Sequence, residues 1–121
     1  MNDKTILIVE DEAIFSLQLK LDLQDRGYTV SSVVSSGNKS VEAAKKDNPD
    51  LILMDISLTD EMSGLEAAEK IREFSKAPII FISGYNDPTK EGESAALDNT
   101  VFLSKPVPVS KILEIIKQLT G

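Results

Sequence analysis

The sequence predicts an α/β domain with a doubly wound (βα)5 fold, in which helices cover both faces of a parallel sheet. Strand-like and helix-like segments alternate along the whole chain. The strand-like segments are nearly continuous apolar runs, which is typical of strands buried on both faces of a parallel sheet. The length of 121 residues suits one domain over 1–121 with a substantial core. Five successive strand–helix units require right-handed crossovers.

Four elements are predicted in the first half of the chain. The first strand is the apolar run Thr5–Val9, and the helix that follows spans Glu12–Arg26, with Gly27 just past its end. Tyr28–Val34 is β-branched and partly alternating, which is typical of an outer strand. The second helix, Ser36–Asp47, ends shortly before a proline, which disfavours helical backbone in the residue before it.

The second half of the chain repeats the alternation three times. Strands are predicted at Leu51–Met54, Ile79–Ile82 and Val101–Leu103. Helices are predicted at Gly64–Phe74, Pro88–Asp98 and Val109–Leu119. The helix over 88–98 is the weakest of these, because it contains an internal glycine and few large apolar residues.

Polar side chains follow four of the predicted strands. Glu10 and Asp11 end the first strand, Asp55 the third, Ser83 the fourth, and Lys105 follows the fifth. Periodicity leaves the strand order open, but the flavodoxin-like order 2-1-3-4-5 is the common solution at this size. That order places the switch point between the first and third strands, so the three carboxylates would lie side by side where ligands of such sheets bind.

The carboxylates predict a site for a hard divalent cation. Like charges in one pocket repel each other, and Mg²⁺ prefers oxygen ligands. Alternatives exist for each group taken alone: Glu10 and Asp11 also suit capping of the following helix, and Lys105 suits an ordinary solvated lysine. The chain has no histidine and no cysteine, which excludes imidazole and thiolate ligands and disulfides.

Charge and hydropathy limit the partners. The net charge of −7, without a basic stripe, argues against nucleic-acid binding. The apolar runs fall well short of the roughly 20 residues that span a bilayer. The polar N-terminus runs directly into a strand, so no signal peptide is expected and the expected location is cytoplasmic.

In order and spacing, a set of six residues resembles the receiver domain of two-component response regulators, and the likeness covers the whole chain. The set comprises Glu10, Asp11, Asp55, Ser83, Lys105 and Pro106. The resemblance implies that Asp55 is the phosphoacceptor and that Lys105 and Ser83 contact the phosphoryl group. It also implies that Glu10, Asp11, Asp55 and the backbone carbonyl of Ser57 hold Mg²⁺, or Mn²⁺ as an alternative.

The resemblance also implies roles at four further positions. The bond between Lys105 and Pro106 is expected to be cis, aiming the lysine into the pocket. Phe102 takes the place of the switch aromatic that responds to Ser83, although a core or edge aromatic is the plain alternative. Ser57 and Tyr85 occupy positions that tune hydrolysis of the acyl phosphate. Because Ser57 lacks a carboxylate or amide to orient water and Tyr85 is bulky, slow self-dephosphorylation is expected.

The expected function is a signalling switch, not a metabolic enzyme. The resemblance implies a phosphohistidine donor, either a sensor histidine kinase or a histidine phosphotransfer protein, and leaves open a homodimer through the fourth helix, fifth strand and fifth helix. No effector segment follows the last helix, so either a single-domain regulator or a piece of a longer protein is expected.

A haloacid-dehalogenase-type phosphohydrolase is disfavoured because Ser57 stands where its second acid belongs. A flavin carrier is disfavoured by the acidic first loop and the 5% aromatic content. A degenerate receiver that acts without phosphorylation stays open.

The first helix carries two apolar faces. Phe15, Leu19 and Leu23 are spaced at i, i+4 and i+8, while Ile14, Leu17 and Leu21 lie on nearly the opposite side. By resemblance the Phe15 face packs inward. The second face is then either a partner surface beside the acidic pocket or is covered by neighbouring helices.

Overall fold

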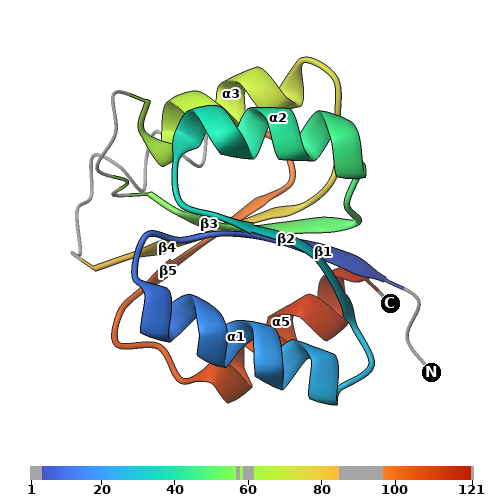
Figure 1. The fold of residues 1–121 in the computed structure, drawn as a ribbon, viewed down its shortest axis with the longest axis vertical. Helices are drawn as coiled ribbons and strands as arrows, with labels where there is room; N and C mark the ends of the chain where they lie inside the picture. Colours follow the sequence, from blue (N-terminus) through green and yellow to red (C-terminus); the bar gives the residue numbers. More distant parts are fainter. Residues whose placement is uncertain (1–3, 57, 59–61, 85–96, 121) are drawn as a thin grey trace.

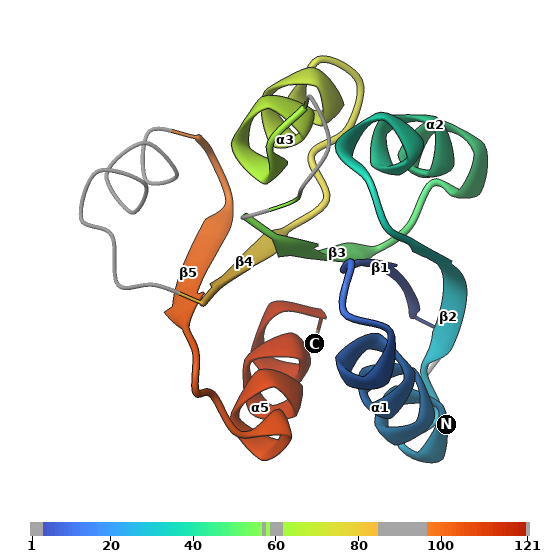
Figure 2. The same ribbon diagram turned by 60° about the vertical axis from the view of Figure 1, so that its left-hand side comes forward.

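The computed structural model confirms the predicted doubly wound fold. It describes residues 4–56, 58, 62–84 and 97–120. One parallel sheet of five strands has the order β2-β1-β3-β4-β5, as expected for a flavodoxin-like domain. Helices α2 and α3 cover one face of the sheet and α1 and α5 the other (Figures 1 and 2). No helix in the described part of the chain is long and apolar enough to cross a membrane.

The elements lie close to their predicted ranges. The strands are β1 (Thr5–Val9), β2 (Thr29–Val34), β3 (Leu51–Asp55), β4 (Ile79–Ser83) and β5 (Thr100–Ser104). The helices are α1 (Ala13–Asp25), α2 (Gly37–Asp47), α3 (Gly64–Arg72) and α5 (Val109–Thr120). Most of the helix predicted over 88–98 falls outside the described residues. Its last two positions, Leu97 and Asp98, lie in a bend and turn rather than a helix.

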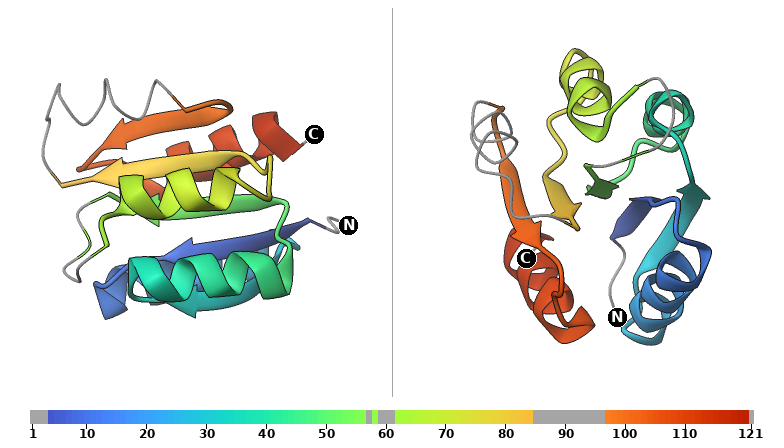
Figure 3. Two further views of the ribbon diagram at one scale, coloured as in Figure 1. Left: turned by 90° about the horizontal axis from the view of Figure 1, so that it is seen from above. Right: turned by 90° about the vertical axis from the view of Figure 1, so that its left-hand side faces the viewer.

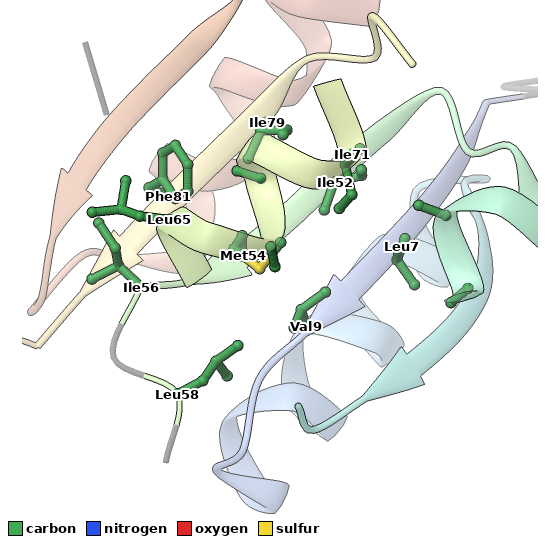
Figure 4. Close-up of a cluster of buried hydrophobic side chains, with 14 residues drawn as sticks. Leu7, Val9, Ile52, Met54, Ile56, Leu58, Leu65, Ile71, Ile79 and Phe81 are labelled. Carbon is green, nitrogen blue, oxygen red and sulfur yellow. The ribbon is translucent and has the colours of Figure 1, made fainter. Parts of the chain in front are cut away.

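Two hydrophobic layers hold the sheet between the helices. Alternate strand residues face opposite sides, so Leu7 and Val9 of β1 pack with α2 and α3 (Figure 4), while Ile6 and Ile8 pack with α1 and α5. Every residue of β3 and β4 is buried, which explains why these strands read as continuous apolar runs. The parity of the strands therefore fixes the direction of the side chains at their ends.

Helix α1 ends as the sequence predicts. Its cap residue is Arg26, and Gly27 follows with φ at 89°, a left-handed backbone conformation that glycine adopts without a steric penalty. The chain then turns directly into β2. This short connection fixes the edge strand beside β1.

The outer face of α1 is uncovered. Leu19 and Leu23 are buried, and Phe15 packs partly buried against the same layer. Ile14 is 85% exposed, whereas Leu17 and Leu21 are 55% exposed. The expectation that the Phe15 face packs inward is confirmed. The alternative that neighbouring helices cover both faces is wrong among the described residues, because α5 packs on the inward side only.

Arg72 anchors the chain where it enters β5. Its guanidinium donates hydrogen bonds to the carbonyl oxygens of Asp98 (2.9 Å), Asn99 (3.1 Å) and Ser75 (3.2 Å). The Asn99 side chain in turn donates to the carbonyl of Lys76 at 2.9 Å. These bonds join the end of α3 to the start of β5. Lys105 directly follows the other end of this strand.

Candidate functional site

The carboxyl ends of the parallel strands all lie on the same side of the sheet (Figure 3). Val9 of β1 pairs with Met54 of β3, so the residues that follow, Glu10 and Asp55, are neighbours across the two strands. On the other side, the backbone N–H of Lys105 donates to the carbonyl of Ser83 at 2.6 Å. The register thus brings together the polar residues that the sequence placed at separate strand ends.

Three carboxylates converge at the switch point between β1 and β3. One oxygen each from Glu10, Asp11 and Asp55 lies within 4.8 Å of the others. Octahedral Mg²⁺ with oxygens at about 2.1 Å requires ligand oxygens roughly 3 to 4 Å apart, so the cluster needs little contraction to hold such an ion. The chemistry and spacing of these donors therefore fit a hard divalent cation. Ser57, whose carbonyl was the fourth expected donor, lies outside the described residues.

The Glu10 carboxyl is buried and strongly perturbed. Its burial, a hydrogen bond with the Asp55 side chain and the negative charge of Asp55 together raise the pKa of Glu10 to about 8. A hydrogen bond from the backbone N–H of Glu12 (3.2 Å) and the charge of Lys105 act in the opposite direction but do not outweigh them. A proton therefore relieves the crowding of negative charge in the metal-free pocket.

Lys105 bridges the acidic cluster and α1. Its Nζ lies 3.3 Å from Glu10 Oε1 and 3.1 Å from Glu12 Oε1, and 4.7 Å from the centre of the Phe15 ring. Burial alone would lower the pKa of Lys105, but the hydrogen bond with Glu12, the charge and hydrogen bond of Glu10, and the charge of Asp55 raise it. The ammonium is thus held charged beside the carboxylates. The peptide bond between Lys105 and Pro106 is cis.

The structure adds Glu12 to the residues predicted from the sequence. The sequence pattern predicts Glu12 as the first residue of a helix, and the structure makes it the N-cap of α1 without a side-chain capping bond. Its ion pair with Lys105 joins residues 93 positions apart. The only signal in the sequence was a third acid directly after the acidic pair.

Ser83 and Phe102 lie on neighbouring strands. Ser83 is fully buried at the end of β4 and pairs with Ser104, whereas Phe102 pairs with Phe81, two residues earlier on the same face of the sheet. The Phe102 ring is partly buried against the layer formed with α2 and α3. Gly84 is exposed, and Tyr85 lies outside the described residues.

Gly64 is a second position that the site requires and that the sequence pattern alone does not identify. A Cβ atom at Gly64 would lie 2.4 Å from the carbonyl oxygen of Asp55 and 2.8 Å from the Cα of Ile56. The start of α3, fixed by a capping box between Ser63 and Glu66, therefore sits directly against the strand end that carries Asp55. A glycine at the start of a helix, downstream of the acidic strand end, was the signal.

The chain is similar in sequence to known proteins. The chain is 30% identical over 118 residues to the chemotaxis protein CheY of Thermotoga maritima, covering 97% of this chain and 98% of that protein. It is 27% identical to the transcriptional regulatory protein PdtaR of Mycobacterium tuberculosis, where the match covers 94% of this chain but only 55% of the relative. The chain therefore spans about half the length of that relative.

A solved structure is similar to this chain in both fold and sequence. The receiver domain of a sensor histidine kinase from Pseudomonas aeruginosa PAO1, solved with a magnesium ion coordinated in its active-site cleft, has a TM-score of 0.85 and 27% identity, with 99% of each chain covered. The family described as the response regulator receiver domain matches residues 6–117. Its match over nearly the whole chain, together with the fold and the strand-end cluster, shows that this chain belongs to the response regulator receiver domains of two-component signalling.

Proposed function

We propose that this domain accepts a phosphoryl group on Asp55 from a phosphohistidine donor and switches conformation to change partner binding. The observation that carries the proposal is the juxtaposition of three carboxylates, with oxygens within 4.8 Å of one another, and the Lys105 ammonium beside them. A site with only carboxylates would repel a phosphoryl group. A site that joins a cation site to a fixed ammonium suits one.

The transfer needs a nucleophile and positive charge rather than an acid–base pair. The Asp55 carboxylate attacks phosphorus, a P–O bond forms, and the P–N bond of the phosphohistidine breaks. The electron pair of that bond stays on the imidazole, which takes up a proton. Lys105 supplies positive charge to the phosphoryl oxygens, and the Ser83 hydroxyl donates a hydrogen bond to one of them.

Glu10, Asp11 and Asp55 would hold the cation, with the Ser57 carbonyl as a further ligand. Mg²⁺ suits this all-oxygen set, and Mn²⁺ is an alternative. Bound there, the ion supplies the charge that lets an anionic donor approach the anionic Asp55. Burial, together with the hydrogen bond and the negative charge of Asp55, raises the pKa of Glu10, and a cation bound beside these carboxyl groups would favour their ionised forms.

The switch rests on Ser83 and Phe102. A phosphoryl group that draws the Ser83 hydroxyl toward Asp55 would favour an inward position of the Phe102 ring on the same face of the sheet. The outer surface of β5 would change with it. That surface, with α5, is also the proposed contact of a homodimer, and the whole of 1–121 is proposed as one receiver domain in the cytoplasm.

Phosphorylation by a small-molecule donor tests the proposed function. Incubation with acetyl phosphate and Mg²⁺ is expected to add the mass of one phosphoryl group, stable in acid and labile in base. Chelation of the metal or the Asp55→Asn substitution, which keeps the shape of the buried side chain, is expected to abolish the gain. A gain that persists in Asp55→Asn would contradict the assignment of the phosphoacceptor. No gain with an intact fold would favour a degenerate receiver, unless a phosphohistidine donor succeeds.

The uncovered face of α1 is the proposed docking surface for the phosphohistidine donor. Ile14, Leu17 and Leu21 expose apolar side chains on the helix whose N-terminus lies at the acidic cluster. A groove of about 380 Å³ lies at the acidic cluster, between the start of α1 and the segment that joins β2 to α2. It is lined by Glu10, Asp11, Ala13, Ser16, Val33, Val34, Ser35 and Lys39. A kinase or phosphotransfer protein seated on this face would bring its phosphohistidine to Asp55.

Leu17→Glu separates docking from chemistry. Transfer from a phosphorylated histidine kinase that serves the wild-type domain is expected to fall about ten-fold or more, because an exposed apolar anchor becomes charged. Phosphorylation by acetyl phosphate and thermal stability are expected to stay near wild type. Phe74→Glu is the matched control, since Phe74 is a 41% exposed apolar residue following α3. Equal loss in both variants, or loss of folding in Leu17→Glu, would count against the docking surface.

A further inference from the structure

Among the described residues, Glu10, Glu12 and the Phe15 ring contact the Lys105 ammonium, and they differ in kind. Glu10 belongs to the carboxylate cluster that fits a cation, and its side chain is only 3% exposed. Glu12 lies outside that cluster, is 65% exposed, and makes the shorter contact with Nζ, 3.1 Å against 3.3 Å. The Phe15 ring takes a third side of the ammonium at 4.7 Å.

We propose that Glu12 is a positioning residue that holds Lys105 on the α1 side of the pocket and competes with the phosphoryl group for it. This inference rests on the proposed function, because Lys105 acts only if a phosphoryl group arrives. The ammonium has three N–H donors, and the two carboxylates and the ring occupy its surroundings. A phosphoryl oxygen that binds Nζ therefore competes with these contacts for the ammonium.

Glu12 is the contact that Lys105 gives up. The Glu10 carboxylate is buried and fixed from the other side by the backbone N–H of Glu12 at 3.2 Å, whereas the Glu12 side chain reaches Lys105 from the solvent-exposed N-cap of α1. An exposed ion pair is weak, so Glu12 tunes the occupancy of the resting lysine position without locking it. Removing the Glu12 carboxylate should therefore strengthen phosphoryl binding modestly.

Substitution of the Glu12 side chain is expected to leave the fold intact for a structural reason. The Glu12 side chain makes no capping hydrogen bond, and the bond to Glu10 uses only the backbone N–H of Glu12. Glu12→Gln keeps that backbone group and nearly the same shape. Glu12→Asp keeps the charge but is shorter by one methylene, so it weakens the 3.1 Å contact while leaving the electrostatic field of the site nearly unchanged.

The test measures binding of beryllofluoride, a phosphoryl analogue, at saturating Mg²⁺ by heteronuclear NMR. Glu12→Gln and Glu12→Asp are both expected to bind about two- to five-fold more tightly than wild type. The rate of phosphorylation by acetyl phosphate is expected to rise in parallel. Asp25→Asn, which removes one negative charge at the opposite end of α1, is the matched control and is expected to match wild type.

Each other outcome overturns the inference in a distinct way. Unchanged or weaker binding of beryllofluoride by Glu12→Gln would show that Glu12 does not compete with the phosphoryl group for Lys105. Tighter binding in Glu12→Gln together with wild-type binding in Glu12→Asp would show that the charge of Glu12, and not its contact with Lys105, causes the effect. If the wild-type domain shows no binding that depends on Mg²⁺ and Asp55, the proposed function itself fails and the inference fails with it.

Discussion

Gly64→Ala is expected to lower the free energy of unfolding by about 1–3 kcal/mol and to weaken Mg²⁺ binding about ten-fold. Helix propensity alone predicts the opposite sign, because alanine is favoured over glycine in a helix by up to about 1 kcal/mol. The packing decides: the added methyl group would lie 2.4 Å from the Asp55 carbonyl oxygen, a backbone atom that cannot rotate away. Either α3 or the end of β3 must shift.

Because the shifted atoms belong to Asp55 and Ile56, the effect reaches the carboxylate cluster. Chemical denaturation measures the stability change, and a Mg²⁺ titration followed by NMR measures the affinity. Gly84→Ala is the matched control, since a Cβ atom there meets nothing within 4 Å. It is expected to be neutral or stabilising by about 0.4–1 kcal/mol. Wild-type stability and Mg²⁺ affinity in Gly64→Ala would show that α3 yields without cost.

Without metal, the domain is expected to lose stability as the pH rises from about 5.5 to 7, and Glu10 is the cause. The pKa of Glu10 is about 8 in the folded protein and 4.5 in its ordinary state. Between these values the folded protein holds a proton that the unfolded chain has released. The stabilisation is complete below the lower value and is lost as pH rises toward the higher one, by up to about 1.4 kcal/mol per pH unit.

The composition of the chain allows a change of stability in this pH range to be assigned to Glu10. The chain has no histidine and no cysteine, and ordinary carboxyl groups titrate near about pH 4, so few other side chains change charge between about pH 5.5 and 7. Glu10→Gln, which keeps the shape without the ionisable group, is expected to flatten the slope in denaturation curves recorded with a chelator. A slope as steep in Glu10→Gln as in wild type would assign the proton to another group.

Saturating Mg²⁺ is expected to abolish this loss of stability with rising pH. A bound cation favours the ionised Glu10 carboxylate, so binding releases the proton and the affinity for Mg²⁺ rises with pH by up to about ten-fold per unit in this window. Calorimetry in buffers of different ionisation enthalpy measures the number of protons released. The expected number approaches one near pH 6 in wild type and falls toward zero in Glu10→Gln.

The chain order of apolar runs and polar strand ends was enough to predict the sheet and most of the site. Continuous apolar runs such as Ile79–Ile82 required strands buried on both faces, and five alternating units required a parallel sheet. Because the carboxyl ends of parallel strands lie on the same side of a sheet, the sequence predicts that Glu10, Asp11 and Asp55 lie together, as the structure shows. Strands and their ends can be predicted from the sequence because both depend on local patterns: a run of apolar residues and the polar residue that ends it.

Contacts between distant segments were decided only by the tertiary structure. The pairing of Glu12 with Lys105 depends on how α1 and the end of β5 approach each other, and no spacing in the sequence encodes that distance. The close approach of Gly64 to Asp55 and the raised pKa of Glu10 have the same origin, since each depends on the packing of a neighbouring element. The uncovered Ile14, Leu17 and Leu21 likewise became a surface only once the packing of α1 placed Leu19 and Leu23 inward. The sequence determined which groups reach the site, and packing determined their separations, their protonation and the surface left for a partner.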